Sequence, residues 1–165
     1  MKLYLMQHGK SMSKEENPER PLTEQGKDDV GRVSQWMSQA GIEVAEIWHS
    51  AKLRAEESAN IAARFLQAQG RVKAVEGLQP NDDVRPIADA LREHATAVML
   101  VGHLPFLSRL SSFLITGDSD LPILQFEMGG IVCLTRQDEK WTLTWMAIPE
   151  MITRERTEGW VPTKA

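Results

Sequence analysis

The sequence predicts an α/β protein, a three-layer α/β/α sandwich with a mostly parallel central sheet and an antiparallel hairpin at one edge. Short apolar runs alternate with amphipathic stretches of helical period from Lys2 to Ile115. Strands that alternate with helices, each crossover right-handed, form such layered sheets. Two strand-like runs then follow one another with only a polar turn between them, and this pattern predicts the hairpin.

The first predicted strand, Lys2–Met6, is short and apolar, and a loop begins at His8 and Gly9. A polar loop follows over Lys10–Pro21. Thr23 has the residue type of a helix N-cap, apolar residues then recur at helical spacing, and Gly41 is the expected stop. The first unit is therefore a strand, a loop and an amphipathic helix.

A second strand is expected at Glu46–Trp48. The hydroxyl of Ser50 is expected to cap the next helix, which ends before Gly70. Val72–Leu78 is predicted as a strand, and Pro80–Asp83 as a loop.

A shorter helix is predicted over Val84–His94. The run Ala97–Val101 is apolar at every position, which is typical of a central parallel strand covered on both faces. Phe106–Ile115 is predicted as another helix.

The edge hairpin is expected to pair Leu124–Thr135 with Trp141–Ile148 across the polar turn Arg136–Lys140. Trp141 and Trp145 are four positions apart in the sequence, an even spacing, so both are expected on one face of the last strand.

The length and charge predict one domain. The chain has 165 residues, with 19 Lys and Arg against 23 Asp and Glu, and a net charge of -4. Residues 1–150 are expected to form this domain, with 151–165 as a tail on the surface or disordered. The acidic balance argues against nucleic-acid and membrane-surface partners, which require clustered positive charge.

Three features predict a cytoplasmic location. Cys133 is the only cysteine and has no partner for an intramolecular disulfide. The N-terminus lacks the apolar core of a signal peptide. No apolar run approaches the roughly 20 residues that span a bilayer.

Candidate site residues follow three predicted strands. His8 follows the first and His103 the most buried one, each beside a glycine, Gly9 and Gly102, that leaves space for a ligand against the main chain. Arg54 lies in the first turn of a helix, where a guanidinium and the helix N-terminus attract the same anion. Ligands of open α/β sheets gather at these carboxyl ends.

Two imidazoles and a guanidinium in one place suit phosphoryl transfer through a histidine. Taken singly, a strand-end histidine is more often a hydrogen-bonded structural residue, and an arginine in a first turn is more often solvated. The joint occurrence of all three favours the functional interpretation.

Four ordered segments resemble the histidine phosphatase (phosphoglycerate-mutase-like) superfamily, and its small phosphohistidine phosphatases of the SixA type most closely. The segments are Leu5–Ser11, Arg20–Gly26, Ser50–Ser58 and Val101–Pro105. The resemblance implies that His8 is the nucleophile that becomes phosphorylated. It also implies that Arg54 and His103 bind the phosphoryl group in the transition state, with Arg20 near the phosphate pocket.

Gln7 departs from the family pattern, because most members have arginine before the nucleophilic histidine. Gln7, Gly9 and Arg20 are the expected phosphate-binding neighbours of His8. A glutamine amide offers neutral donors, whereas arginine offers a permanent charge and a fork of donors. One alternative is therefore a weak catalyst or a phosphate- or phosphoprotein-binding module that does not turn over.

A general acid is the second open point. The resemblance places a carboxylate in the loop that contains Asp82 and Asp83, either of which is a possible proton donor. A pair of aspartates in a loop is more commonly a solvated turn or a helix cap. A phosphohistidine substrate relaxes the need for an acid, because its imidazole leaving group can already carry a proton.

Other phosphatase chemistries lack their residues. A cysteine phosphatase needs Arg six positions after its Cys, but Glu139 stands there after Cys133. The sequence shows no histidine pair at metal-ligand spacing and no Walker loop. We expect no metal and no cofactor.

The spans between the motifs leave no room for a lid over the site. An open site suits a phosphorylated protein, such as a histidine-phosphotransfer protein, as substrate. The alternative among enzymes is a small-molecule phosphomonoesterase. The sequence does not predict the oligomeric state.

Overall fold

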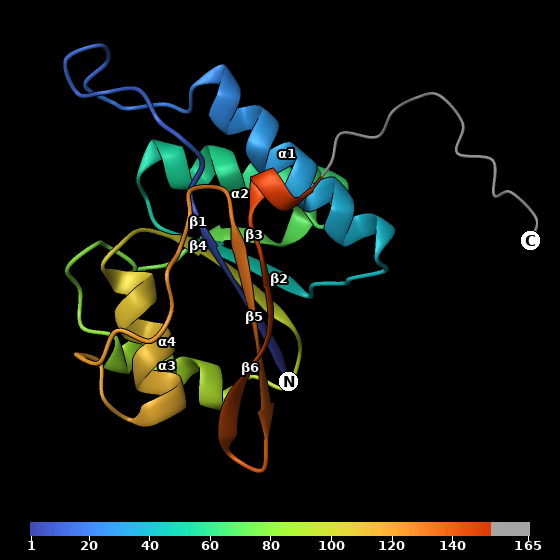
Figure 1. The fold of residues 1–165 in the computed structure, drawn as a ribbon, viewed down its shortest axis with the longest axis vertical. Coiled ribbons are helices and arrows are strands. Elements are labelled where there is room, and N and C mark those ends of the chain that lie inside the picture. Colours follow the sequence, from blue (N-terminus) through green and yellow to red (C-terminus); the bar gives the residue numbers. More distant parts are fainter. Residues whose placement is uncertain (153–165) are drawn as a thin grey trace, which may run out of the picture.

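A computed structural model of the chain describes residues 1–152. Its strands and helices alternate along the sequence until the last two strands, as expected (Figure 1). The strands are β1 (Lys2–Gln7), β2 (Glu46–His49), β3 (Val72–Ala74), β4 (Val98–Gly102), β5 (Ile131–Gln137) and β6 (Lys140–Ala147). The helices are α1 (Glu24–Gln39), α2 (Leu53–Phe65), α3 (Arg85–Glu93) and α4 (Phe106–Thr116), with short 3-10 turns at Gln69–Arg71 and Pro149–Met151.

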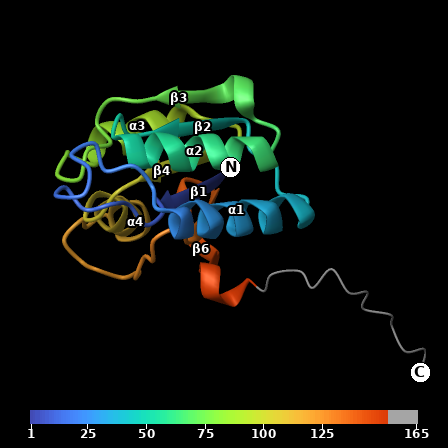
Figure 2. The same cartoon turned by 90° about the horizontal axis from the view of Figure 1, so that it is seen from above.

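The six strands form one sheet in the order β3-β2-β4-β1-β5-β6. The pairs β1–β4, β2–β4 and β2–β3 are parallel, whereas β5 runs antiparallel to both β1 and β6. Figure 2 shows the parallel strands side by side in this order. The predicted mostly parallel sheet with an antiparallel edge hairpin is confirmed.

Two layers of helices cover the sheet, with α1 and α2 on one face and α3 and α4 on the other (Figure 1). β1 shows the division, because its side chains alternate between the faces. Tyr4 and Met6 belong to the buried cluster under α1 and α2, and Leu3 and Leu5 to the cluster under α3 and α4. This explains why the central strands are apolar throughout.

The hairpin is tighter than predicted. Asp138 and Glu139 connect its strands, and both have positive φ, 46° and 64°. Two such residues form the mirror-image turns whose twist matches antiparallel strands. The predicted strand from Leu124 begins only at Ile131, since Gly129 has φ 73° and its N–H donates to the carbonyl oxygens of Gln7 and His8 at the end of β1.

The prediction that Trp141 and Trp145 share a face is wrong. Cys133 pairs with Trp145 but the next residue, Leu134, pairs with Leu143, so β6 contains a bulge. The extra residue reverses the alternation. Trp145 packs on Tyr4 on the α1 side of the sheet, whereas Trp141 lies in the cluster under α3 and α4.

The start of α1 agrees with the prediction, whereas both ends of α2 and the length of β3 differ from it. Thr23 caps α1 as predicted, and its hydroxyl accepts a hydrogen bond from the Gly26 N–H at 3.0 Å. The cap residue of α2, however, is Lys52 and not Ser50, and α2 ends at Phe65. The strand predicted at Val72–Leu78 is shorter, because β3 pairs with β2 only from Val72 to Ala74, where β2 ends at His49.

None of the helices in residues 1–152 has the length and apolar character needed to cross a bilayer. The predicted tail lies outside the described residues from 153 onward.

Candidate active site

The predicted site residues come together because three parallel strands end at one edge of the sheet. Gln7 pairs with Gly102, and His49 pairs with Val101, so β1, β4 and β2 end level with one another. His8 and His103 follow the first two of these strands. Arg54 lies in the first turn of α2, which follows the third.

The His8 ring is held by two contacts. Its Nδ1 lies 2.7 Å from the Gly9 carbonyl oxygen, and this bond requires the proton on Nδ1. Nε2 therefore keeps a lone pair, and the Nε–H of Arg54 donates to it at 3.3 Å. This is the tautomer in which Nε2 can act as a nucleophile.

His103 lies beside His8, with 5.0 Å between the ring centroids. It is 2% exposed, and neither ring nitrogen has a hydrogen-bond partner within residues 1–152. The side-chain oxygen of Gln7 is also buried and has no hydrogen-bond partner there. Buried polar atoms are nearly always paired, so these three mark a place for a polar ligand.

Both imidazoles are uncharged at neutral pH. Burial is the main reason that the pKa of His8 falls to about 4, with smaller effects of the charges on Arg54 and Arg20. Burial also lowers the pKa of His103 to about 3, helped by His8 and then by the cations Arg54, Lys52 and Arg20. The same cations attract an anion to the site.

Arg20 reaches this group from the loop between β1 and α1. Its backbone has φ 52°, a region that non-glycine residues rarely occupy. Its guanidinium donates to the Met12 carbonyl at 3.2 Å and to the Ser11 hydroxyl at 3.3 Å. Burial lowers the pKa of Arg54, and the positive charge of Arg20 lowers it further.

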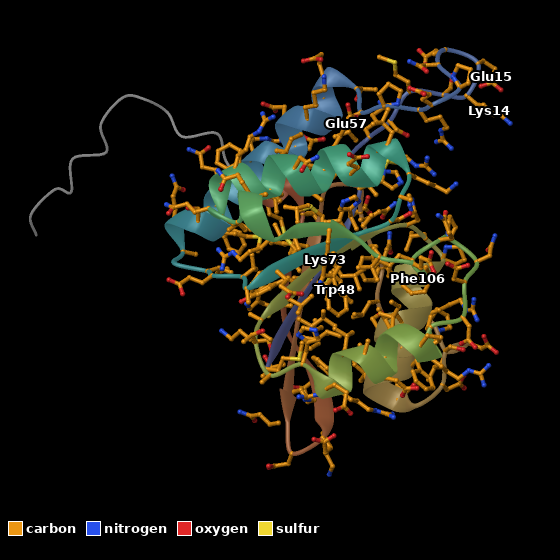
Figure 3. All side chains as sticks on the ribbon, turned by 180° about the vertical axis from the view of Figure 1, so that it is seen from behind. Lys14, Glu15, Trp48, Glu57, Lys73 and Phe106 are labelled. Atoms are coloured by element: carbon orange, nitrogen blue, oxygen red, sulfur yellow. The ribbon has the colours of Figure 1, made fainter. Side chains whose placement is uncertain are left out.

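Glu57 anchors this loop to α2. Its carboxylate accepts a hydrogen bond from the Leu22 N–H at 2.6 Å. Figure 3 shows Glu57 on the helix, below the loop that carries Lys14 and Glu15 at its tip. The loop thus approaches the site from the α2 side.

Gly9 packs closely against the first turn of α1. A Cβ at this position would lie 2.7 Å from the Gly26 carbonyl oxygen. Its N–H donates to the hydroxyl of Ser58 at 3.0 Å. A direct contact between Gly9 and phosphate stays a prediction.

Asp82 and Asp83 are engaged in local structure. Asp82 accepts a hydrogen bond from the Gln79 N–H at 2.8 Å. Asp83 accepts the Arg85 N–H at the start of α3 and pairs with the guanidinium of the same residue. Those hydrogen bonds lower the pKa of Asp83 to about 2, so it carries no proton to donate at neutral pH. The structure favours the turn and cap interpretation of this pair.

Sequence reasoning missed Ser58 and Lys52. Ser58 is completely buried between Gly9 and the turn of α2 that carries Arg54. The sequence contained a usable signal, because a residue four positions after Arg54 lies on the same face of a helix.

Within residues 1–152, no group of three or more His, Cys, Asp or Glu side chains is arranged to hold a metal ion.

Comparison with known proteins identifies related chains. A family model described as histidine phosphatase superfamily (branch 1) matches residues 3–80. Phosphohistidine phosphatase SixA of Escherichia coli (strain K12) is 24% identical over 155 residues, which cover 90% of this chain and 94% of SixA.

Two solved structures show the shared fold. The protein histidine phosphatase SixA complexed with tungstate has a TM-score of 0.83 at 24% identity, covering 93% of this chain and 100% of that chain. A putative alpha-ribazole-5'-P phosphatase from Escherichia coli str. K-12 substr. MG1655 has a TM-score of 0.75 at 17% identity, covering 90% and 98%.

Proposed function

Because a histidine phosphatase superfamily model matches residues 3–80 and SixA is 24% identical over 90% of this chain, we propose that the chain is a phosphatase of this type and that it hydrolyses phosphohistidine in a protein substrate through a phosphorylated His8. The observation that carries the proposal is the state of His8. Its ring is neutral, its Nε2 carries the lone pair, and that atom faces Arg54.

The reaction has two steps. In the first, His8 Nε2 attacks phosphorus and the P–N bond of the substrate breaks. The substrate imidazole already carries a proton on its other ring nitrogen, so it takes the electron pair of the P–N bond and leaves as neutral imidazole, while His8 keeps its Nδ1 proton and becomes a phosphorylated imidazolium. In the second, water attacks phospho-His8, which releases inorganic phosphate and restores the neutral ring. Each step moves one phosphoryl group in line between two nucleophiles.

Arg54 and Arg20 provide the positive charge that this transfer requires. The equatorial oxygens gain charge in the transition state, and fixed cations stabilise it. His103 adds a donor, because both of its ring nitrogens are free of partners within residues 1–152. A bound phosphoryl dianion also favours protonation of His103, since an opposite charge raises the pKa of an imidazole.

Phosphohistidine is the proposed substrate for two reasons. Asp83 has a pKa of about 2 and is paired with Arg85, so it is not available to protonate an alkoxide leaving group. An imidazole leaving group does not need such an acid. The related SixA is named a phosphohistidine phosphatase.

A small-molecule phosphomonoesterase is the second candidate, because a putative alpha-ribazole-5'-P phosphatase shares the fold. Turnover of a phosphohistidine protein, a phosphoserine peptide and a sugar phosphate separates the possibilities. We expect hydrolysis of the first, an acid-labile phosphoenzyme, no loss of activity in EDTA, and loss of both activity and phosphoenzyme in His8→Ala.

His94→Gln is the matched control, since this histidine lies next to Trp48 and away from the site. Activity that persists in His8→Ala would contradict the mechanism. Binding of phosphoprotein without release of phosphate would instead support the binding module that Gln7 suggests.

A further inference from the structure

Two large apolar side chains are exposed at the mouth of the site. Leu104 directly follows His103 and is 39% exposed. Met128 is 49% exposed and precedes Gly129, whose N–H donates to the carbonyl oxygens of Gln7 at 2.9 Å and His8 at 3.2 Å. Both are therefore within one residue of groups that form the site.

The two side chains lie on opposite sides of the nucleophile. Leu104 follows β4 and Met128 precedes β5, and β1, which leads to His8, pairs with both of these strands. The Gly129 hydrogen bonds hold the Met128 backbone against the end of β1. Single exposed apolar residues are common on protein surfaces. What distinguishes these two is their position, since they flank the strand that leads to His8 on both sides.

The other part of the mouth is cationic. Lys52 begins α2, and Lys10 follows Gly9. Neither lysine lies within ion-pair distance of a carboxylate in the part of the chain that the structure describes. The mouth thus combines unpaired positive charge with two apolar side chains.

We propose that Leu104 and Met128 form an apolar docking rim for the protein segment that carries the phosphohistidine. The rim receives apolar side chains of the substrate that flank the phosphorylated residue, while the phosphoryl group enters between Arg54 and His103. This inference rests on the proposed function. A sugar phosphate fits the rim poorly, since its hydroxyls would lose water without gaining a hydrogen bond from Leu104 or Met128.

Two phosphohistidine peptides test the rim, one with leucine and one with glycine on both sides of the phosphorylated residue. We measure kcat/KM for each and take the ratio within each variant, so that changes common to both peptides cancel. The wild type is expected to prefer the leucine peptide about tenfold, which corresponds to burial of a small part of two apolar side chains.

The variant Leu104→Ser/Met128→Ser is expected to lower this ratio to about one, while Leu143→Ser should retain the preference. Leu143 is 42% exposed on the edge strand β6 and is the matched control. A wild-type ratio near one, or an unchanged ratio in the double variant, would overturn the rim. Failure to hydrolyse either peptide would instead count against the proposed function, so the two failures are distinguishable.

Discussion

The backbone N–H of Gly9 donates a hydrogen bond of 3.0 Å to the hydroxyl of Ser58, and that hydroxyl donates in turn to the Arg54 carbonyl at 2.7 Å. One buried side chain therefore joins the residue after His8 to the helical turn that carries Arg54. Neither strand pairing nor core packing provides this link, so Ser58 is a positioning residue for both groups.

Ser58→Ala is expected to lower kcat about tenfold with KM within about twofold, because small displacements of reacting groups slow a reaction strongly. Ser58→Thr keeps the hydroxyl and should recover most of the rate. The control is Ser34→Ala, which removes another fully buried hydroxyl, one without a partner in residues 1–152. Equal kinetic effects of the two alanine variants would refute the positioning role.

Gln7→Arg is expected to strengthen binding of tungstate, a phosphate analogue, about tenfold, since charge-assisted hydrogen bonds are about twice as strong as neutral ones. Calorimetric titration at two salt concentrations measures the affinity and its screening. Gln137→Arg adds the same charge at the far end of β5 and should leave the affinity unchanged. Weaker binding to Gln7→Arg would mean that the pocket is shaped for the smaller amide.

The histidines predict a loss of stability in acid. In the folded chain the pKa values of His8 and His103, about 4 and about 3, lie below the usual 6.5. At pH 7 both side chains are therefore mostly neutral in the folded chain and in the unfolded chain. Between pH 6.5 and about 4 the unfolded chain takes up protons that the folded chain does not, and the free energy of unfolding falls.

Between pH 7 and pH 5 the free energy of unfolding should therefore fall by about 1 to 2 kcal/mol less in His103→Asn than in the wild type. Urea denaturation at the two pH values measures this difference. Equal losses in both proteins would show that His103 is not held neutral by the fold.

Substitution by alanine should change the stability in opposite directions at two glycines of α1, Gly26 and Gly31. A Cβ on Gly26 would lie 2.1 Å from the Lys10 carbonyl oxygen, whereas a Cβ on Gly31 would meet only the Phe65 ring at 3.6 Å. We expect Gly26→Ala to cost about 2 kcal/mol or more and to lower activity, because the loop after His8 must move.

Gly31→Ala should raise the stability by about 0.5 to 1 kcal/mol, since alanine favours a helix over glycine. Thermal unfolding followed by circular dichroism compares both variants with the wild type. A stable and active Gly26→Ala would contradict the close approach of α1 to the loop.

The elements were predictable where local pattern and tertiary packing agree. The run at Val98 to Val101 is apolar because helices cover both of its faces. The prediction failed where a single backbone conformation decides the outcome. Residues 124 to 128 alternate apolar and polar side chains as a half-buried strand does, but the positive φ of Gly129 delays pairing until Ile131. The bulge that separates Trp141 from Trp145 likewise leaves no trace in the spacing of side chains.

The sequence by itself determined the fold class and proposed His8, Arg54 and His103 as one group, because residues after parallel strands meet at one edge of the sheet. Tertiary structure alone decided which nitrogen of His8 is free, that both imidazoles are neutral, and that Ser58 joins the two halves of the site. Those properties depend on burial, on the hydrogen bond between the His8 ring and the adjacent Gly9 carbonyl, and on contacts between residues 46 or more positions apart, none of which periodicity encodes.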